Sequence, residues 1–304
     1  MYIASRIRLE RILKNTWKVD VLMVISSTAG YLLHDNLIKY HLDIPTIVPS
    51  VLGTAIAFFI GFNNNQAYDR WWEARKIWGM LVNDSRTWSR GVIGYINPKS
   101  MLGEDQIMAI HSRLVTRHIA FLYALKGYLR GTDDYTYKTY LSAEEVARVS
   151  AQSNTHNAIL MEQSRDLSQL YDKGYLDGYK FLQLDAMLVK FSDEMGMSER
   201  IKNTVFPTTY NYFTKVFIWL FVVSVSLVLS AAMGPWSIFL SWLIGFVFVS
   251  TQVNGMSLID PFKNDAASIP LNQITRTIEI NLLEMLGEVN IPEPVRPVNG
   301  EYVL

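Results

Sequence analysis

Three side chains at a four-residue spacing, Thr54, Phe58 and Phe62, could control the passage of ions if several copies of their segment surrounded one axis. Residues four apart lie along one side of a helix, so these three form a stripe. A ring of phenyl groups makes a narrow passage that water leaves easily, and the dry passage opposes ions without any charged group. The alternative is that the stripe packs against neighbouring helices or lipid.

Small residues occupy the other faces of the same segment. They are Gly53, Ala55, Ala57 and Gly61. Small side chains let helices approach one another closely inside a membrane. Several copies of the segment could therefore pack around an axis with the stripe pointing inward.

A polar run, Asn63-Asn64-Asn65-Gln66, follows the stripe. Each amide beside a lipid core needs a hydrogen-bonding partner or water. A water-filled vestibule would supply the water, which makes Asn63, Asn64 and Gln66 candidate vestibule residues. The same run is also expected if it only marks the point at which the helix emerges from the membrane.

The residues that usually carry catalysis or bind metals form no recognisable site. His111 and His118 lie seven apart on one predicted helix, but no third ligand of matching spacing accompanies them, so we predict a structural role. Carboxylate pairs such as Asp193 with Glu194 are common on solvated helices. The chain has no cysteine, no Gly-rich phosphate loop and no His-Glu-x-x-His helix. We therefore predict no catalytic site, no bound metal and no cofactor.

Composition favours a membrane protein over a nucleic-acid-binding protein. Apolar residues make up 50% of the 304 residues, and 28 basic residues balance 28 acidic ones. Nucleic-acid binders usually have an excess of positive charge, so we expect no nucleic-acid partner. Any role of charge must be local.

Uncharged stretches predict four membrane spans. Residues 216–259 contain no Asp, Glu, Lys, Arg or His, and they hold two spans of about 20 residues each, separated by Met233-Gly234-Pro235-Trp236. Residues 44–68 form another uncharged stretch, whose apolar part is 47–62. The first span, 21–33, is shorter, and its polar flanks could extend it to the interface. This segment could instead be the core of a signal peptide, but it starts late and has no clear cleavage site.

The flanking charges predict the topology. Basic residues before the first span and after the second indicate that both flanks are cytoplasmic. They are Arg6, Arg8, Arg11, Lys14 and Lys18, then Arg70, Arg75, Lys76 and Arg86. We therefore expect a multi-pass protein of the cell (inner) membrane with both termini in the cytoplasm, in contact with membrane lipid.

Four regions follow from these patterns. Residues 1–68 hold the first two spans, and residues 69–207 form a cytosolic domain of amphipathic helices with no useful β-alternation. Residues 208–259 form the hairpin of spans three and four. Residues 260–304 hold a helix at 271–286 and an extended, proline-rich tail.

Several motifs resemble the bestrophin family of ion channels. Ile60-Gly61-Phe62 followed by Tyr68-Asp69-Arg70-Trp71-Trp72-Glu73-Ala74-Arg75 is similar to the second-helix signature of that family. Further matches follow in the same order over nearly the whole chain. They are Arg117-His118-Ile119-Ala120, Leu129-Arg130-Gly131, Glu199-Arg200-Ile201-Lys202-Asn203-Thr204, Ile259-Asp260-Pro261-Phe262 and Arg276-Thr277-Ile278-Glu279-Ile280-Asn281-Leu282-Leu283-Glu284.

The resemblance implies a homopentamer around one central pore, with four transmembrane helices per subunit and a large helical cytosolic region. The second helix forms the neck of the pore, and the matching neck positions fall on Thr54, Phe58 and Phe62. Thr54 departs from the usual bulky aliphatic residue, which implies a wider outer ring. A second, cytosolic aperture lies ahead of Asp185 and falls on Tyr179 by a loose alignment.

The resemblance does not extend to the calcium site of animal bestrophins. Those proteins clasp calcium with a cluster of acidic residues after the Pro-Phe match. The corresponding stretch here, Lys263-Asn264-Asp265-Ala266-Ala267-Ser268, has a single carboxylate. Calcium usually takes about six to eight oxygen ligands, so we do not expect calcium gating.

The sequence therefore predicts passive conduction of small inorganic ions through a pentameric pore with a hydrophobic gate. Animal and plant bestrophins conduct anions such as chloride, whereas bacterial members have been assigned selectivity for monovalent cations such as sodium. Asp43 near the outer mouth would favour cations, and helix N-termini near Pro49 would favour anions. Two rival classes stay open: a secondary transporter, and a membrane-anchored scaffolding or signalling protein.

Overall fold

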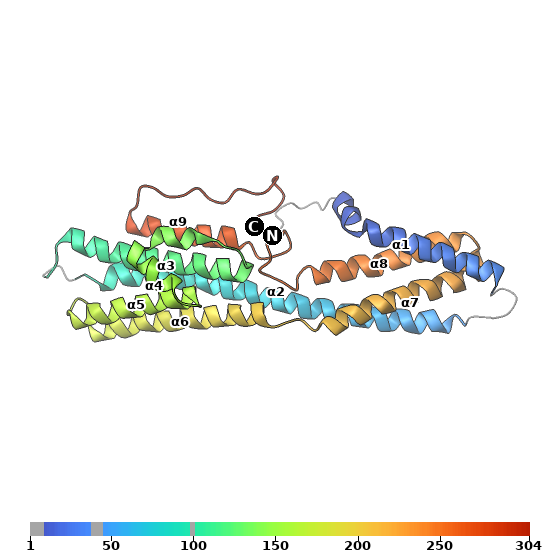
Figure 1. Cartoon of the computed structure of the whole chain (residues 1–304), viewed down its shortest axis with the longest axis horizontal. Coiled ribbons are helices and arrows are strands. Elements are labelled where there is room, and N and C mark those ends of the chain that lie inside the picture. Colours follow the sequence, from blue (N-terminus) through green and yellow to red (C-terminus); the bar gives the residue numbers. More distant parts are fainter. Residues whose placement is uncertain (1–8, 38–44, 98–100) are drawn as a thin grey trace. The chain divides into compact units, whose positions relative to one another are not determined.

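All the regular elements of the described chain are helices. The computed structural model describes residues 9–37, 45–97 and 101–304 (Figure 1). Within them, the one β-type feature is an isolated bridge between Val298 and Tyr302. The chain is therefore all-α, as the sequence predicts.

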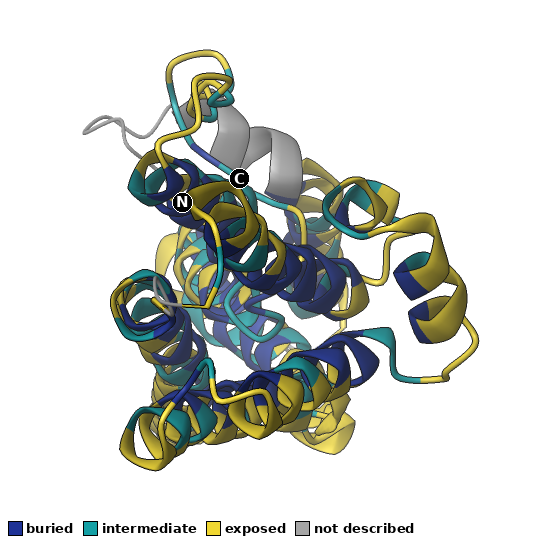
Figure 2. Ribbon diagram, turned by 90° about the vertical axis from the view of Figure 1, so that its left-hand side faces the viewer, coloured by how far each residue is buried: buried dark blue, intermediate teal, exposed yellow. Residues whose placement is uncertain are grey.

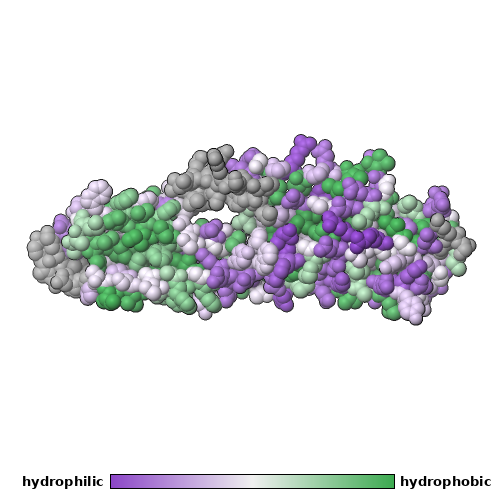
Figure 3. Space-filling model, turned by 180° about the vertical axis from the view of Figure 1, so that it is seen from behind, coloured by the Kyte–Doolittle hydropathy of each residue, from purple (hydrophilic) through white to green (hydrophobic). Residues whose placement is uncertain are grey.

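The described residues divide into two units, which we treat separately. The polar unit comprises residues 72–204 and 260–304, and the apolar unit comprises the described residues up to 71 together with 205–259. One helix, α2 (Ile47–Tyr95), is continuous over 49 residues and contributes its first half to the apolar unit and its second half to the polar unit. Hydrophobic side chains gather over the apolar unit and hydrophilic ones over the polar unit (Figure 3).

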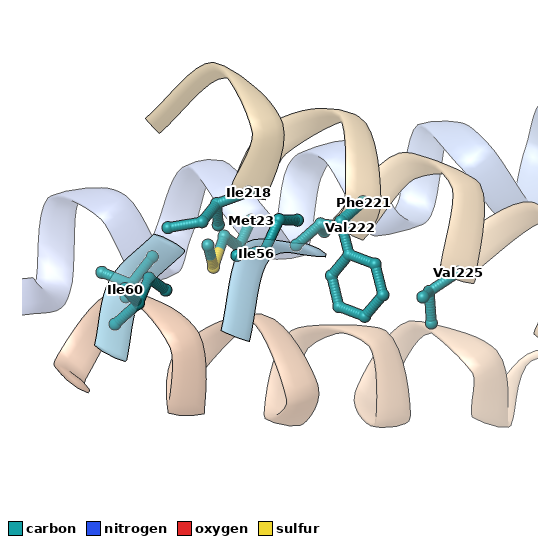
Figure 4. Packing of buried hydrophobic residues seen from close by; sticks show 8 residues of the cluster. Met23, Ile56, Ile60, Ile218, Phe221, Val222 and Val225 are labelled. Carbon is teal, nitrogen blue, oxygen red and sulfur yellow. The ribbon is translucent and has the colours of Figure 1, made fainter. Parts of the chain in front are cut away.

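The apolar unit is a bundle of α1 (Leu9–Asn36), the first half of α2, α7 (Thr208–Met233) and α8 (Trp236–Met256). Helix α1 packs against both α7 and α8, which also pack against each other. Their facing sides enclose a hydrophobic core (Figure 4). Its buried members are Met23, Ile56, Ile60, Ile218, Phe221, Val222, Val225 and Val249.

Three of these helices, α2, α7 and α8, are long and apolar enough to cross a membrane. Helix α1 is long enough in residues but is not among the three. The first predicted span, residues 21–33, therefore lies inside the helix α1, and its crossing of the membrane stays a prediction.

The break between α7 and α8 falls where the sequence predicts it. Helix α7 ends at Met233 and α8 begins at Trp236. Gly234 has φ +58° and ψ −133°, a backbone conformation open to glycine and strained for other residues. Pro235 then supplies a fixed φ at the start of α8. The hairpin is thus a local consequence of two residues.

The polar unit consists of the second half of α2 and the remaining helices. These are α3 (Glu104–Arg130), the 3-10 helix η2 (Tyr135–Tyr140), α4 (Ala143–Ser150), α5 (Thr155–Asp172), α6 (Gly178–Asn203) and α9 (Leu271–Leu286). Buried residues lie on the inward sides of these helices and exposed residues on the outward sides (Figure 2). Helix α3 is buried almost continuously from Leu114 to Leu129 and packs on α5, α6 and α9.

Local signals place the ends of these helices. The side chain of Ser142 accepts the N–H of Glu145, and the Glu145 carboxylate accepts the N–H of Ser142 at 2.8 Å, which is the capping box that opens α4. Helix α3 ends at Gly131, whose φ of +62° closes the helix. Helix α9 has the predicted bounds, and the non-helical tail after it returns to α9 through the Gln273 N–H, which donates to the Leu304 carbonyl at 2.9 Å.

Candidate functional site

The first half of α2 has one buried and one exposed side. Ile56, Ile60 and Ala67 are at most 3% exposed and face the bundle. On the opposite side, Phe58 is 73% exposed and Phe62 is 48% exposed. The predicted stripe therefore lies on the side of α2 that the other described helices of the apolar unit leave uncovered.

Exposed polar residues continue the stripe beyond the two phenyl rings at both ends. Thr54 is exposed one turn before Phe58, and its hydroxyl donates to the Ser50 carbonyl at 2.9 Å within the helix. Gln66 is exposed one turn after Phe62. The four-residue repeat thus runs from a hydroxyl, over two phenyl rings, to an amide on one side of the helix.

Two amides fix the rotation of α2 against α7 and α8. Asn63 is 4% exposed, and its side chain donates to the Thr214 hydroxyl at 3.2 Å. The Asn64 side chain donates to the Thr251 carbonyl at 3.2 Å. An amide inside an apolar bundle needs such a partner, so these two bonds favour one rotation of the helix.

The amide bonds correct part of the sequence-based expectation. Asn63 and Asn64 are both candidate vestibule residues by sequence, but Asn63 is buried inside the apolar unit and the Asn64 amide points to α8. Gln66 alone of the three lies on the exposed side with Phe58 and Phe62. The residues of the polar run therefore lie on two faces of the helix: Asn63 and Asn64 bond inside the bundle, and Gln66 is exposed.

The small residues of α2 also separate into two groups. A methyl group added at Gly53 would come within 2.9 Å of the Phe221 ring, so this glycine lets α7 approach. A methyl group at Gly61 would meet nothing within 4 Å, and Ala57 and Gly61 are both exposed beside the stripe. Packing within one chain accounts for Gly53 but not for Gly61.

The other predicted positions lie apart from the stripe. Tyr179 is in the first turn of α6 in the polar unit and is 86% exposed, close behind the helix-capping residue Asp177. Asp43 lies outside the described residues. The roles of Tyr179 and Asp43 in a pore therefore stay predictions.

The two histidines considered as metal ligands have structural partners. His111 Nε2 lies 2.6 Å from the Ile96 carbonyl, and His118 Nε2 lies 2.8 Å from the Ser85 hydroxyl. Burial lowers the pKa of His118 to about 3, so its ring is neutral, and it packs against the Phe191 ring with the ring centres 4.2 Å apart. Among the described residues there is no group of three side chains suited to a metal ion.

The stretch that matches the animal calcium site uses its one carboxylate internally. Oxygen Oδ1 of Asp265 accepts the N–H of Ala267 at 3.0 Å and both the N–H and the hydroxyl of Ser268, at 3.1 and 2.8 Å. These bonds close the loop between α8 and α9. One oxygen of the carboxylate is thus used by its own loop, and the other, Oδ2, lies 3.6 Å from the Lys263 ammonium.

One unusual acid is not singled out by its sequence pattern. Glu194 of α6 is 2% exposed, and burial together with the nearby Asp84 carboxylate raises its pKa to about 8. Lys190 lies 3.2 Å from Asp84 and only partly offsets this. In the sequence, Asp193-Glu194 looks like an ordinary solvated pair, and only the tertiary contact with α2 distinguishes the second member.

Comparisons with known proteins add an independent line of support. The family model described as "Bacterial/Fungal Bestrophin protein" matches residues 4–284. The chain is 34% identical over 260 residues to "Voltage-dependent anion channel-forming protein YneE" of Escherichia coli K12, covering 84% of this chain and 83% of that protein. It is 27% identical over 267 residues to "Voltage-dependent anion channel-forming protein RSc3414" of Ralstonia nicotianae, covering 87% and 85%.

Solved structures agree with the sequence comparison. A crystal structure of a bacterial bestrophin homolog from Klebsiella pneumoniae superimposes with a TM-score of 0.82 at 30% identity, over 89% of this chain and 98% of that chain. A second crystal structure, described only as that of a membrane protein, superimposes with a TM-score of 0.83 at 29% identity, over 90% and 99%. The likeness therefore covers both units.

Proposed function

The chain belongs to the bacterial and fungal bestrophin family, and from this premise we propose that it is a passive ion channel and not an enzyme. With α2, α7 and α8 each long and apolar enough to span a bilayer, it is an integral membrane protein. The proposed assembly is a homopentamer with four spans per subunit, both termini in the cytoplasm of the cell, and α2 lining a central pore. Small inorganic ions are the proposed cargo.

The observation that supports the pore most directly is the exposed stripe on α2. Phe58, at 73% exposed, points away from the other described helices of the apolar unit, while Asn63 and Asn64 hold another side of α2 against α7 and α8. In the proposed pentamer, Thr54, Phe58 and Phe62 form three successive rings of the neck. The two phenyl rings gate by dewetting. Gln66 lines the vestibule below them.

The small exposed residues support the close approach that such rings require. Ala57 and Gly61 flank the phenyl rings, and no residue that the structure describes fills the space beside Gly61. Small residues at these positions allow a second α2 helix to pack against the first. In this proposal they form the seam between neighbouring subunits.

The permeating ion is proposed from the relatives. The Escherichia coli and Ralstonia proteins are named as voltage-dependent anion channel-forming proteins, so we propose that anions such as chloride permeate. A pore of hydrophobic rings favours neither sign of charge by itself, and an Asp43 ring would favour monovalent cations such as sodium. Reversal potentials in unequal salt, for the parent and for Asp43→Asn, decide between the two.

The neck assignment is tested with purified protein in planar bilayers. Replacing both phenyl rings, Phe58→Ala with Phe62→Ala, should raise unitary conductance or open probability because the dry constriction widens. The matched control is Phe239→Ala, which removes a ring of α8 that is about as exposed as Phe62 and should leave the current unchanged. Unchanged current in the double variant would remove these residues from the neck.

Two further outcomes separate the rival functions. The absence of current from the parent protein and from every variant would favour a membrane-anchored scaffold. Flux that requires a counter-transported solute would favour a secondary transporter.

The proposed second aperture at the start of α6 is tested with Tyr179→Ala. A change in conductance would support this aperture, whereas parent-like currents would contradict it.

A further inference from the structure

A cavity of about 390 Å³ lies between α1, α7 and α8 of the apolar unit. Its volume is within the range of roughly 300–1,000 Å³ that is usual for small-molecule sites. Leu22 of α1, Ile218 of α7 and Val249 of α8 contribute to a lining that is mostly apolar. An apolar cavity on a membrane-spanning bundle suits a hydrocarbon chain.

The polar groups of the cavity gather at one end. Asn211 and Lys215 lie one turn apart on α7, and the Gln252 amide of α8 donates to the Asn211 side chain at 3.1 Å. Ile218 follows on the same side of α7. The cavity is therefore amphipathic, with amides and an ammonium group at the beginning of α7 and apolar side chains further along the helix.

The cation at that end has no acidic partner in the described chain. Lys215 is exposed, and none of the residues that the structure describes pairs with its ammonium group. It is also the last charged residue before the uncharged segment 216–259. A lysine at such a boundary lies at the depth of the lipid headgroups, where it attracts negative charge.

A second basic residue is the sequence neighbour of one residue of the lining. Lys18 of α1 is exposed and directly precedes Val19, which lines the cavity. Basic pockets between membrane helices on the cytoplasmic side are typical binding places for anionic lipid headgroups. Among the described lining residues the charged one is Lys215, and its positive charge complements a phosphate and not a choline or ammonium group.

The side of the bundle on which the cavity lies also favours lipid. Helix α1 passes behind α7 and α8 while α2 lies in front of them (Figure 4). If α2 faces the pore, as in the proposed function, then α1 and the cavity beside it face away from the pore. A lipid then has access from the bilayer.

We propose that this cavity binds one anionic phospholipid per subunit, taken from the surrounding leaflet. One acyl chain lies against Leu22, Ile218 and Val249, and the phosphate contacts the Lys215 ammonium with the Asn211–Gln252 amides beside it. The side-chain chemistry selects a headgroup with net negative charge over a zwitterionic one.

The test measures thermal unfolding of the full-length protein in detergent, titrated with phosphatidylglycerol or with phosphatidylcholine of the same acyl chains. Phosphatidylglycerol should raise the melting temperature saturably and more than phosphatidylcholine does. Lys215→Gln should weaken the apparent affinity for phosphatidylglycerol about fivefold, which is the effect of one cation near the membrane surface. Lys173→Gln, a matched change at an exposed lysine of the polar unit, should leave it unchanged.

A second variant tests the hydrocarbon part without touching the charge. Val253 lines the cavity and is 43% exposed, so Val253→Phe can be accommodated while filling the space. It should reduce stabilisation by phosphatidylglycerol although Lys215 remains. Stabilisation that survives both variants, or an equal response to both lipids, would overturn the proposal.

Two other occupants are distinguished in the same series. If inorganic phosphate alone reproduces the stabilisation, the site binds a free anion and the lipid proposal is wrong. Because the chain contains no cysteine, Val253→Cys offers a single thiol. If that thiol cross-links to another copy, a neighbouring subunit covers the cavity and the proposal is also wrong. Neither readout depends on current, so failure of the channel proposal would show separately in the bilayer recordings.

Discussion

The two units of this chain bury their polar groups in different ways. In the polar unit, the guanidinium of Arg117 is almost fully buried and contacts the carboxylates of Glu145 and Asp166, the latter at 2.8 Å. In the apolar unit, the Ser226 hydroxyl donates to the Ser27 carbonyl at 2.8 Å across α1 and α7. In the polar unit, opposite charges join α3 to α4 and α5, whereas in the apolar unit hydroxyls and amides join the helices.

In the apolar unit, helix backbones also approach one another closely at glycines. Methyl groups added at Gly30 and Gly245 would come within 3 Å of Ser226 and Val222 respectively. Water drives helices together in a soluble bundle, but between helices in lipid that driving force is missing. The apolar unit therefore depends on close packing at small residues, and the polar unit on a hydrophobic core that also offsets the cost of burying charged networks.

The largest expected effect comes from breaking the charged network. Burial by itself would raise the pKa of Glu145, but hydrogen bonds from Ser142 and Arg117 hold that pKa below its usual value. Arg117→Met leaves the buried carboxylates without their cation, which should cost about 3–5 kcal/mol of unfolding free energy. Chemical denaturation followed by circular dichroism measures the loss.

A matched arginine provides the control for that change. Arg165 pairs with Glu162 at 2.6 Å, but its side chain is 56% exposed. Arg165→Ala should therefore cost less than about 1 kcal/mol. Equal losses for the two arginines would mean that burial of the network does not matter.

The second effect concerns close packing in the apolar unit. A methyl group at Gly255 of α8 would lie 1.7 Å from Asn64 Oδ1 of α2, so the Asn64 amide would have to move and give up its bond to the Thr251 carbonyl. Gly255→Ala should therefore destabilise the protein by about 1–3 kcal/mol, measured by thermal unfolding in detergent. Combining it with Asn64→Ala should recover part of the loss, because the clash disappears.

At Gly196 of α6, in the polar unit, the same substitution should change stability in the opposite direction. It is exposed in the middle of a helix, and an added methyl group would meet nothing within 4 Å. Gly196→Ala should stabilise the protein by about 0.5–1 kcal/mol, because alanine has less backbone freedom to lose. Destabilisation by both alanine substitutions would contradict the packing argument.

The third effect is a pH dependence confined to the polar unit. Because the pKa of Glu194 is about 8 in the folded protein and 4.5 in its ordinary state, the folded protein holds this proton more tightly. Stability should fall as pH rises between those two values, by at most about 1.4 kcal/mol per pH unit. Asp84 and Asp193 oppose ionisation of Glu194, and Lys190 favours it.

Melting temperatures measured across this pH range test the assignment. Glu194→Gln keeps a neutral side chain at the site, so the melting temperature of this variant should fall less as the pH rises. Asp193→Asn changes a neighbouring acid with a smaller influence on Glu194 and should leave most of the decline in place. A decline that persists unaltered in Glu194→Gln must come from another group.

The smallest effect belongs to a single hydroxyl in the apolar unit. Ser226→Ala removes one hydrogen bond between α1 and α7, which should cost about 0.6 kcal/mol. The Ser250 hydroxyl of α8 donates only within its own helix, to the Val247 carbonyl at 3.2 Å. Ser250→Ala should therefore be neutral, and an equal loss at both serines would contradict a role for the interhelical bond.

The sequence predicts best what neighbouring residues decide. The turn at Gly234-Pro235, the capping box at Ser142 and the bounds of α9 depend on residues a few positions apart, and all three agree with the structure. The stripe of Thr54, Phe58 and Phe62 also follows from spacing, since helix geometry places these residues on one side. Its exposure is a fact of packing that spacing alone does not give.

The rest depends on partners far along the chain. Asn63 and Asn64 look like part of one polar run, but their bonding partners Thr214 and Thr251 lie more than 150 residues away. Glu194 looks like a solvated acid until α2 brings Asp84 against it. The sequence neighbours of Lys215 show only that a span begins, and α1 and α8 complete its cavity.

The two-residue connection between α7 and α8 has a consequence for biosynthesis. Gly234 and Pro235 alone join helices that contain no ionisable side chain from residue 216 onward. Such a short link holds the two helices together as they leave the ribosome, so they should enter the bilayer as one hairpin and not one after the other. The connection is also too short to adopt other conformations easily, which makes it a poor place for an inserted tag or a protease site.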